Sequence, residues 1–89
     1  MQVSNLMSNK GNKIANQFNI IDDDGNQYFQ SYDSIIAKIV KYRTVYLDEK
    51  YWNYSKTTSK YRNIWLGLTT RETEQQISDG KIILTNLNN

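Results

Sequence analysis

Apolar and polar residues alternate along the first half of the chain. From residue 13 the two kinds fall on opposite sides of an extended segment, with Ile14, Phe18 and Ile20 against Lys13, Gln17 and Asn19. This period of two predicts a half-buried strand. Residues 34–40 alternate in the same way, and residues 44–47 are β-branched and aromatic types that favour strands.

Turn residues connect these strands. Asp24-Gly25 is a strong hairpin signal, because glycine accepts positive φ and aspartate tolerates it. Residues 27–32 then form the returning strand, with Tyr28 on one face and Phe29 on the other. The connection 41–43 lacks glycine, so we predict an antiparallel meander of three to four strands.

The period changes in the second half. Tyr61, Ile64, Trp65 and Leu68 have the i, i+3, i+4, i+7 spacing of one helical face. Ser55, Thr57 and Thr58 offer capping hydroxyls upstream. The capping-box spacing of residues 69–72 predicts a second short helix at the surface, ending near Asp79-Gly80.

The predicted fold class is therefore α+β. A meander of three to four antiparallel strands is covered by one amphipathic helix, with a short surface helix and a C-terminal strand over residues 81–87. Residues 1–12 are polar and aperiodic, so we predict a flexible N-terminal tail. Residues 13–89 then form a single small domain.

The composition removes most classes of enzyme. The 89 residues include neither cysteine nor histidine, so the thiolate nucleophile and the commonest general base and zinc ligand are missing. The serine and threonine hydroxyls have no imidazole beside them, and no glycine-rich phosphate loop is present. We predict a non-enzymatic protein with no catalytic residues and no cofactor.

The three aspartates at 22–24 raise the question of a metal site. An EF-hand loop with Gly25 at its sixth position needs glutamate at the twelfth, where this chain has Ser31. We interpret the run as a hairpin tip and predict no metal ligands.

Basic charge is concentrated in one segment. The whole chain carries a formal net charge of +2, which is too mild to imply nucleic acid. Residues 38–62, however, hold seven basic residues against two acidic ones, among several tyrosines and tryptophans. Cations interleaved with aromatic rings are typical of single-stranded nucleic acid binding. A small domain also needs such rings for its core, so we assign most of the aromatics to the core and the cations to the surface.

Partner contacts are expected around the start of the first helix, with Tyr51 or Tyr54 exposed beside the cations. A helix start also directs free N–H groups at anions, and a small anionic molecule bound there is a third alternative. The predicted partner-binding residues are Tyr51, Tyr54, Lys56, Thr57, Lys60 and Arg62.

Three stretches carry a resemblance: "YFQSYDSIIAKI", "VYLDEKYWNYSKTTSKYRNIWLG" and "TRETEQQISDGKIILTNLN". Together they resemble a family of small proteins of unknown function from tailed phages of low-GC Gram-positive bacteria. The resemblance implies a phage or prophage origin and carries over no functional residue. Small phage proteins of this size are similar in kind to anti-CRISPR and other anti-defence proteins, which mostly act by occupying a host protein.

These observations lead to one expectation and its alternative. We expect a binding protein that acts on a host or defence protein in the bacterial cytoplasm. The alternative is direct nucleic acid binding through residues 38–62. No apolar run approaches the roughly 18 residues of a membrane span, so no membrane partner is expected. Monomer and homodimer both stay open.

Overall fold

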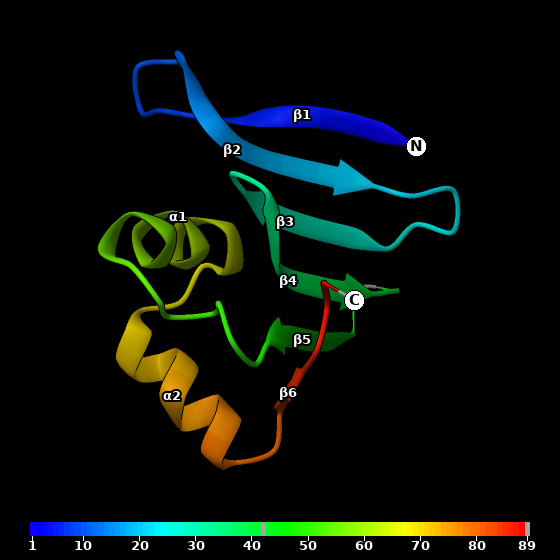
Figure 1. Ribbon diagram of the computed structural model, residues 1–89, viewed down its shortest axis with the longest axis vertical. Helices are drawn as coiled ribbons and strands as arrows, with labels where there is room; N and C mark the ends of the chain where they lie inside the picture. The colour runs from blue at the N-terminus through cyan, green and yellow to red at the C-terminus, as the bar shows by residue number, and fades with distance from the viewer. Residues whose placement is uncertain (42, 89) are drawn as a thin grey trace.

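A computed structural model describes residues 1–41 and 43–88. The described chain forms six strands and two helices (Figure 1). In chain order they are β1 (Gln2–Met7), β2 (Lys13–Ile21), β3 (Gln27–Ser31), β4 (Ser34–Val40), β5 (Thr44–Asp48), α1 (Lys56–Leu66), α2 (Thr70–Ser78) and β6 (Ile82–Thr85).

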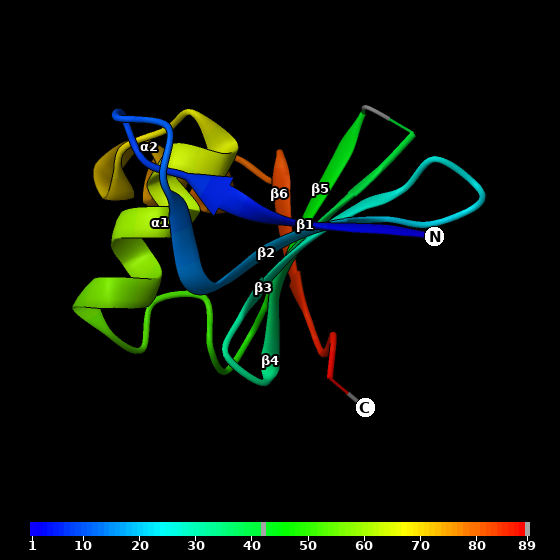
Figure 2. The same cartoon turned by 90° about the horizontal axis from the view of Figure 1, so that it is seen from above.

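All six strands belong to one sheet, in the order in which they occur along the chain. Neighbouring strands are antiparallel from β1 to β5, whereas β6 pairs in parallel with β5. A parallel pair needs a crossover connection, and α1 and α2 lie in that connection. Figure 2 shows both helices on one side of the twisted sheet.

The core lies between the sheet and the helices. The fully buried apolar side chains come from four strands: Phe29, Ile36, Ala37, Leu47 and Ile82. Trp65 of α1 stacks on Phe29 with 6.1 Å between ring centroids, and its indole N–H donates to the Asn19 side chain at 2.8 Å. The aromatic rings of the second half thus build much of the core, as the sequence predicts for so small a domain.

The α+β class is confirmed, and the segments predicted as a meander of three to four strands form the four strands β2 to β5. The predicted turns are also present. Asp22 accepts the N–H groups of Asp24 and Asn26, each at 2.9 Å, and Gly25 has φ +85°. In the connection after β4, Lys41 adopts φ +51° in place of a glycine; Tyr42 lies outside the described residues.

The prediction of a flexible tail over residues 1–12 is wrong. Gln2–Met7 forms the edge strand β1, in register with β2 from Gln2 opposite Ile21 to Asn5 opposite Phe18. An edge strand is held largely by its backbone hydrogen bonds to one neighbour, so its side chains need not show a strong apolar pattern. The sheet has six strands, where the sequence predicted a meander and a separate C-terminal strand.

The helical layer also differs from the prediction. The sequence predicted that one helix covers the sheet and that the second lies at the surface, whereas both helices lie on the same side of the sheet, and Ile64 is 57% exposed. The buried positions of α1 are Thr58 and Arg62, one turn apart, and Trp65 continues the same stripe. The helix is therefore rotated so that two polar residues face inward and Ile64 faces outward.

Candidate functional site

The residues predicted to contact a partner gather around the start of α1. Ser55 caps the helix by accepting a hydrogen bond from the Thr58 N–H at 3.1 Å. Just before the cap, Tyr54 is 52% exposed and meets the half-buried ring of Tyr51 edge to face, with 5.3 Å between centroids. The other exposed members of the predicted set are Lys56, Thr57 and Lys60.

Arg62 is the exception, and its assignment to a partner-binding surface is wrong. Its exposed fraction is 0%. One terminal nitrogen donates to the Trp52 carbonyl and to Asn53 at 3.2 Å, and the other donates to Asn63 at 2.8 Å and Thr70 at 2.9 Å. The guanidinium also lies over the Trp52 ring, 5.1 Å from its centroid. Arg62 therefore joins the segment before α1 to the start of α2 and has a structural role.

The charge of Arg62 is stabilised by hydrogen bonds to uncharged carbonyl, amide and hydroxyl oxygen atoms. Within the part of the chain that the structure describes, no carboxylate lies within ion-pair distance of it. Burial lowers the pKa of the guanidinium, and the Glu74 carboxylate opposes this shift through space. Arginine remains protonated in proteins, so the interior of the helical layer holds a permanent positive charge.

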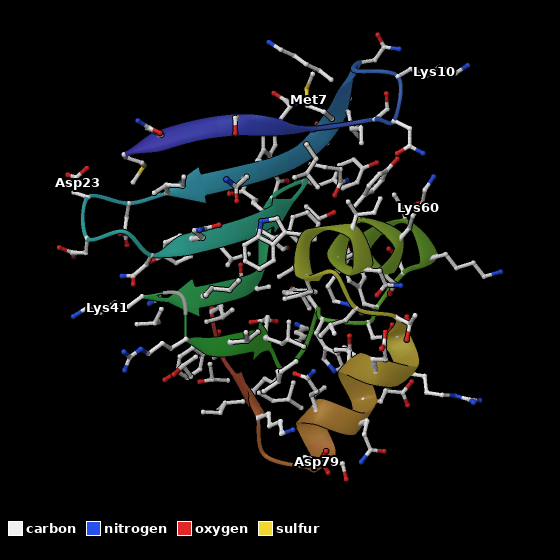
Figure 3. The ribbon with its side chains drawn as sticks, turned by 180° about the vertical axis from the view of Figure 1, so that it is seen from behind. Met7, Lys10, Asp23, Lys41, Lys60 and Asp79 are labelled. Atoms are coloured by element: carbon white, nitrogen blue, oxygen red, sulfur yellow. The ribbon has the colours of Figure 1, made fainter. Side chains whose placement is uncertain are left out.

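The basic residues of segment 38–62 do not form one patch. Lys38 lies on the sheet, Lys41 follows β4 at the far end of the molecule, and Lys60 projects from α1. Figure 3 shows Lys41 and Lys60 at opposite ends of the view. With Arg62 buried as well, the local net charge expected from the sequence is spread over separate surfaces.

A second surface is the face of the sheet turned away from the helices, which we call the open face. Phe29, Ala37, Leu47 and Ile82 are buried under the helices, so their chain neighbours point to the opposite side. Strand register aligns those neighbours in a row across all six strands: Val3, Ile20, Tyr28, Lys38, Tyr46 and Ile83. Five of the six are apolar or aromatic, and α1 and α2 both lie on the other side of the sheet (Figure 2).

Strand β2 is oriented against its own amphipathic pattern. Its polar side faces the helices, where Gln17 is 1% exposed and Asn19 bonds to Trp65. Its apolar side, with Phe18 and Ile20, belongs to the open face. Burial alone favours the reverse arrangement, because a strand normally turns its apolar residues to the core. The open face therefore carries half-buried apolar side chains in its centre, between the exposed Val3 and Ile83 of the two edge strands.

Polar groups also lie on the open face, where Asn5 and Gln30 flank Phe18 and Lys38 lies between Tyr28 and Tyr46. The Lys38 ammonium lies 5.3 Å from the Tyr28 ring centroid, and the Tyr28 hydroxyl donates to Asp22 at 3.0 Å. Burial acts to raise the pKa of Asp22, but hydrogen bonds from Asn26, Tyr28 and Asp24 outweigh it and the pKa is lowered. Asp22 thus stays ionised at neutral pH and places a negative charge beside Tyr28, at the hairpin between β2 and β3.

The sequence contained part of the signal for this surface. The assignment of Tyr28 and Phe29 to opposite faces is confirmed. The alternation in β2 also identified Phe18 and Ile20 as one side of a strand, but it does not say which side the helices cover. That choice depends on the Trp65–Asn19 and Phe29 contacts, which join residues far apart in the chain.

Other site types are not found in the described residues. Residues 1–41 and 43–88 contain no group of three or more acidic side chains placed to hold a metal ion. Neither of the two described helices has the length and apolarity that a membrane span requires.

Comparison with known families gives one match. The family described as a family of unknown function (DUF8033) matches residues 1–83. The chain belongs to this family. The match includes α1, α2 and the whole row of the open face from Val3 to Ile83, so the candidate surfaces lie within the family's extent. No curated protein and no solved structure matches the chain.

Proposed function

We propose that this protein is a non-enzymatic binding protein whose open face docks on a partner protein. The observation that carries the proposal is the inverted orientation of β2, which buries Gln17 and places the half-buried Phe18 and Ile20 on the open face. Together with the uncovered row from Val3 to Ile83, it forms an apolar surface of the kind that marks interaction sites.

The chemistry of the open face favours a protein over a nucleic acid. The row contains one cation, Lys38, and the Asp22 carboxylate lies beside it at the hairpin between β2 and β3. Binding to a phosphate backbone relies on several cations acting together. The partner surface that fits is apolar, with an acidic group opposite Lys38. Tyr28 and Tyr46 beside this lysine suit the buried centre of such an interface, where aromatic residues contribute most of the affinity.

The class of partner follows from the resemblance to small phage proteins. On that basis we propose that the partner is a bacterial host or defence protein in the cytoplasm, which is inhibited by being occupied. The exposed residues at the start of α1, Tyr54, Lys56, Thr57 and Lys60, form a separate polar surface on the helical side. In this proposal they lie outside the main contact.

The second candidate function is single-stranded nucleic acid binding on the same face. Tyr28 and Tyr46 lie on alternate strands with Lys38 between them, and bases stack on exposed aromatic rings while cations contact phosphates. This arrangement would involve the basic segment through Lys38 and Tyr46 and leave Lys56 and Lys60 unused.

A capture experiment from bacterial lysate, with and without nuclease, separates the two candidates. The informative variant is Tyr46→Glu, which places a carboxylate at the centre of the open face. The matched control is Ile64→Glu, since Ile64 is an exposed apolar residue on the helical side. We expect a protein partner that survives nuclease, with affinity reduced at least about 30-fold by Tyr46→Glu and unchanged by Ile64→Glu.

Three results would contradict the proposal. Loss of the captured species after nuclease would favour the nucleic acid candidate. Equal capture by Tyr46→Glu and the unchanged protein would exclude the open face. Loss of capture with Ile64→Glu alone would move the contact to α1. Circular dichroism of both variants establishes that each remains folded.

A further inference from the structure

The outer edge of β1 is the second exposed feature of the sheet. β1 is the outermost strand, and Figure 1 shows no element beyond it. Its six residues, QVSNLM, contain no charged residue and no proline. Natural proteins usually protect long edge strands with charges, proline or a covering element. Over Gln2–Asn5, where β1 and β2 run in unbroken register, this edge has none of these protections.

The backbone groups that face outward can be identified from the hydrogen bonds of β2. Asp22 donates its backbone N–H to the Asn26 carbonyl at 3.0 Å. The backbone N–H and C=O groups of the even-numbered residues of β2 therefore point toward β3. Because the direction of the backbone N–H and C=O groups alternates from residue to residue along an antiparallel strand, those of Asn19 and Ile21 point toward β1.

Their partners across the ladder are Ser4 and Gln2. These two residues therefore use their N–H and C=O groups within the sheet. The alternate residues Val3 and Asn5 direct both backbone groups away from β2, toward the open edge. The Asn5 side chain is already engaged, since its amide donates to the Ile14 carbonyl at 2.9 Å.

We propose that two copies of this chain associate through β1, antiparallel, about a two-fold axis at Ser4. In this register Val3 of one copy exchanges two backbone hydrogen bonds with Asn5 of the other, and the symmetric pair contributes two more. Ser4 then lies directly opposite Ser4 of the second copy. A two-fold axis at Val3 would pair Asn5 with Met1, which lies outside β1, and an axis at Asn5 would pair Val3 with Met7, where the ladder with β2 is irregular.

Several features suit β1 to a second copy of itself. The strand is uncharged, so two copies meet without repulsion. The N-terminal ammonium is paired with Asp23 of its own chain and adds no unpaired charge at the edge. The exposed Val3, at 60%, comes to lie opposite Asn5 and diagonal to Val3 of the second copy. The other edge strand, β6, is only four residues long and presents a shorter backbone ladder.

The association extends the sheet across both copies and places their open faces side by side. One strand pair buries much less than the roughly 1,600 Å² of a standard interface, so the dimer is expected to be reversible and concentration-dependent. The inference does not depend on the proposed function, because the edge contact leaves the open face uncovered.

A charge exchange at Ser4 tests the register. Ser4 is exposed, so Ser4→Lys and Ser4→Glu should each fold normally. Like charges directly opposite each other destabilise a strand pair, and opposite charges stabilise it. By sedimentation velocity up to about 1 mM, we expect the unchanged protein to dimerise, each variant alone to associate about fivefold more weakly, and their mixture to recover the dimer.

Substitution at Val3 tests the role of the backbone. Val3→Pro removes an outward N–H without breaking a bond to β2, a position where edge strands accept proline. Val3→Ala is the matched control, since it shortens the side chain but keeps the N–H. We expect Val3→Pro to remain monomeric with its circular dichroism spectrum unchanged, and Val3→Ala to dimerise.

The inference is overturned if the unchanged protein is monomeric up to about 1 mM, or if the Ser4→Lys and Ser4→Glu mixture associates no better than either variant alone. Equal loss of the dimer in Val3→Ala and Val3→Pro would also overturn it, because side-chain packing would then account for the contact. None of these results alters the capture experiment with Tyr46→Glu, so the two proposals fail separately.

Discussion

A single charged side chain, Arg62, connects three segments at the centre of the helical layer. It donates hydrogen bonds to residues 52–53, to α1 and to the first residue of α2, and its whole side chain is buried. Lys56 and Lys60, on the same helix, are exposed. In the sequence these three residues look equivalent, and only the arrangement of carbonyl, amide and hydroxyl groups around one of them makes burial favourable.

We predict that Arg62→Met destabilises the fold by at least about 2 kcal/mol, because the volume is nearly kept while several buried acceptors lose their donor. The free energy of unfolding in urea measures this. Lys60→Met is the matched control on the exposed side of α1 and should change stability by no more than about 0.5 kcal/mol. Similar values for the two variants would show that the hydrogen-bond network around Arg62 contributes little.

At the scale of elements, α2 depends on its ends. The helix has nine residues and one large apolar residue, Ile77, that packs against the core. The predicted capping box is confirmed: Thr69 Oγ1 accepts from the Glu72 N–H at 3.0 Å, and Glu72 Oε1 accepts from the Thr69 N–H at 2.9 Å. Helices this short are marginal in isolation, so the cap carries a large share of the local stability.

Thr69→Ala should therefore cost about 1 kcal/mol in the free energy of unfolding, the usual loss for a capping hydroxyl. Amide exchange in residues 70–78 should increase more than in α1, because the cap acts locally. Thr57→Ala is the control, since Thr57 is exposed on α1. An exchange increase distributed evenly over both helices would indicate that the cap supports the whole domain.

At the scale of the molecule, Asp48 joins the sheet to segments far apart in the chain. Its carboxylate accepts the N–H groups of Lys50 at 3.1 Å, Tyr51 at 2.9 Å and Leu87 at 2.8 Å. Burial acts to raise the pKa of Asp48, but these hydrogen bonds and one from the Asn88 side chain outweigh it, and the pKa is lowered. The ionised form therefore holds the end of β5, the approach to α1 and the C-terminal segment together.

This arrangement predicts how stability depends on pH. The folded pKa values of Asp48 and Asp22 lie below the ordinary value of 3.8. The contribution of both carboxylates to the free energy of unfolding is therefore complete above that value. It is lost as pH falls through the folded pKa values. The thermal midpoint should be nearly constant around neutral pH and fall below about pH 4.

Asp48→Asn should lower the midpoint at neutral pH and reduce the fall in acid, because the titrating group is gone. Asp33→Asn replaces an exposed carboxylate and is the control. We expect its thermal midpoint to depend on pH in the same way as that of the unchanged protein. A full acid fall in Asp48→Asn would assign the pH dependence to other groups.

The sequence by itself determined the local structure of this protein. Alternation, strand-favouring residue types and the Asp24-Gly25 turn predicted β2 to β5. The capping box at Thr69 located the start of α2, and Ser55 was one of three cap candidates for α1. These features depend on a few neighbouring residues, whose backbone preferences and hydrogen bonds act within one turn or one strand. The absence of histidine and cysteine likewise bounded the chemistry without any structure.

The tertiary structure alone decided which sides of these elements are covered. It turned Arg62 inward and Ile64 outward, made residues 2–7 an edge strand, and left the apolar side of β2 on the open face. Each of these outcomes depends on partners distant in the sequence, such as Asn19 with Trp65 or Arg62 with Thr70. A periodic pattern states that two sides of an element differ, but the free energy that selects the buried side comes from contacts that exist only once the chain has folded.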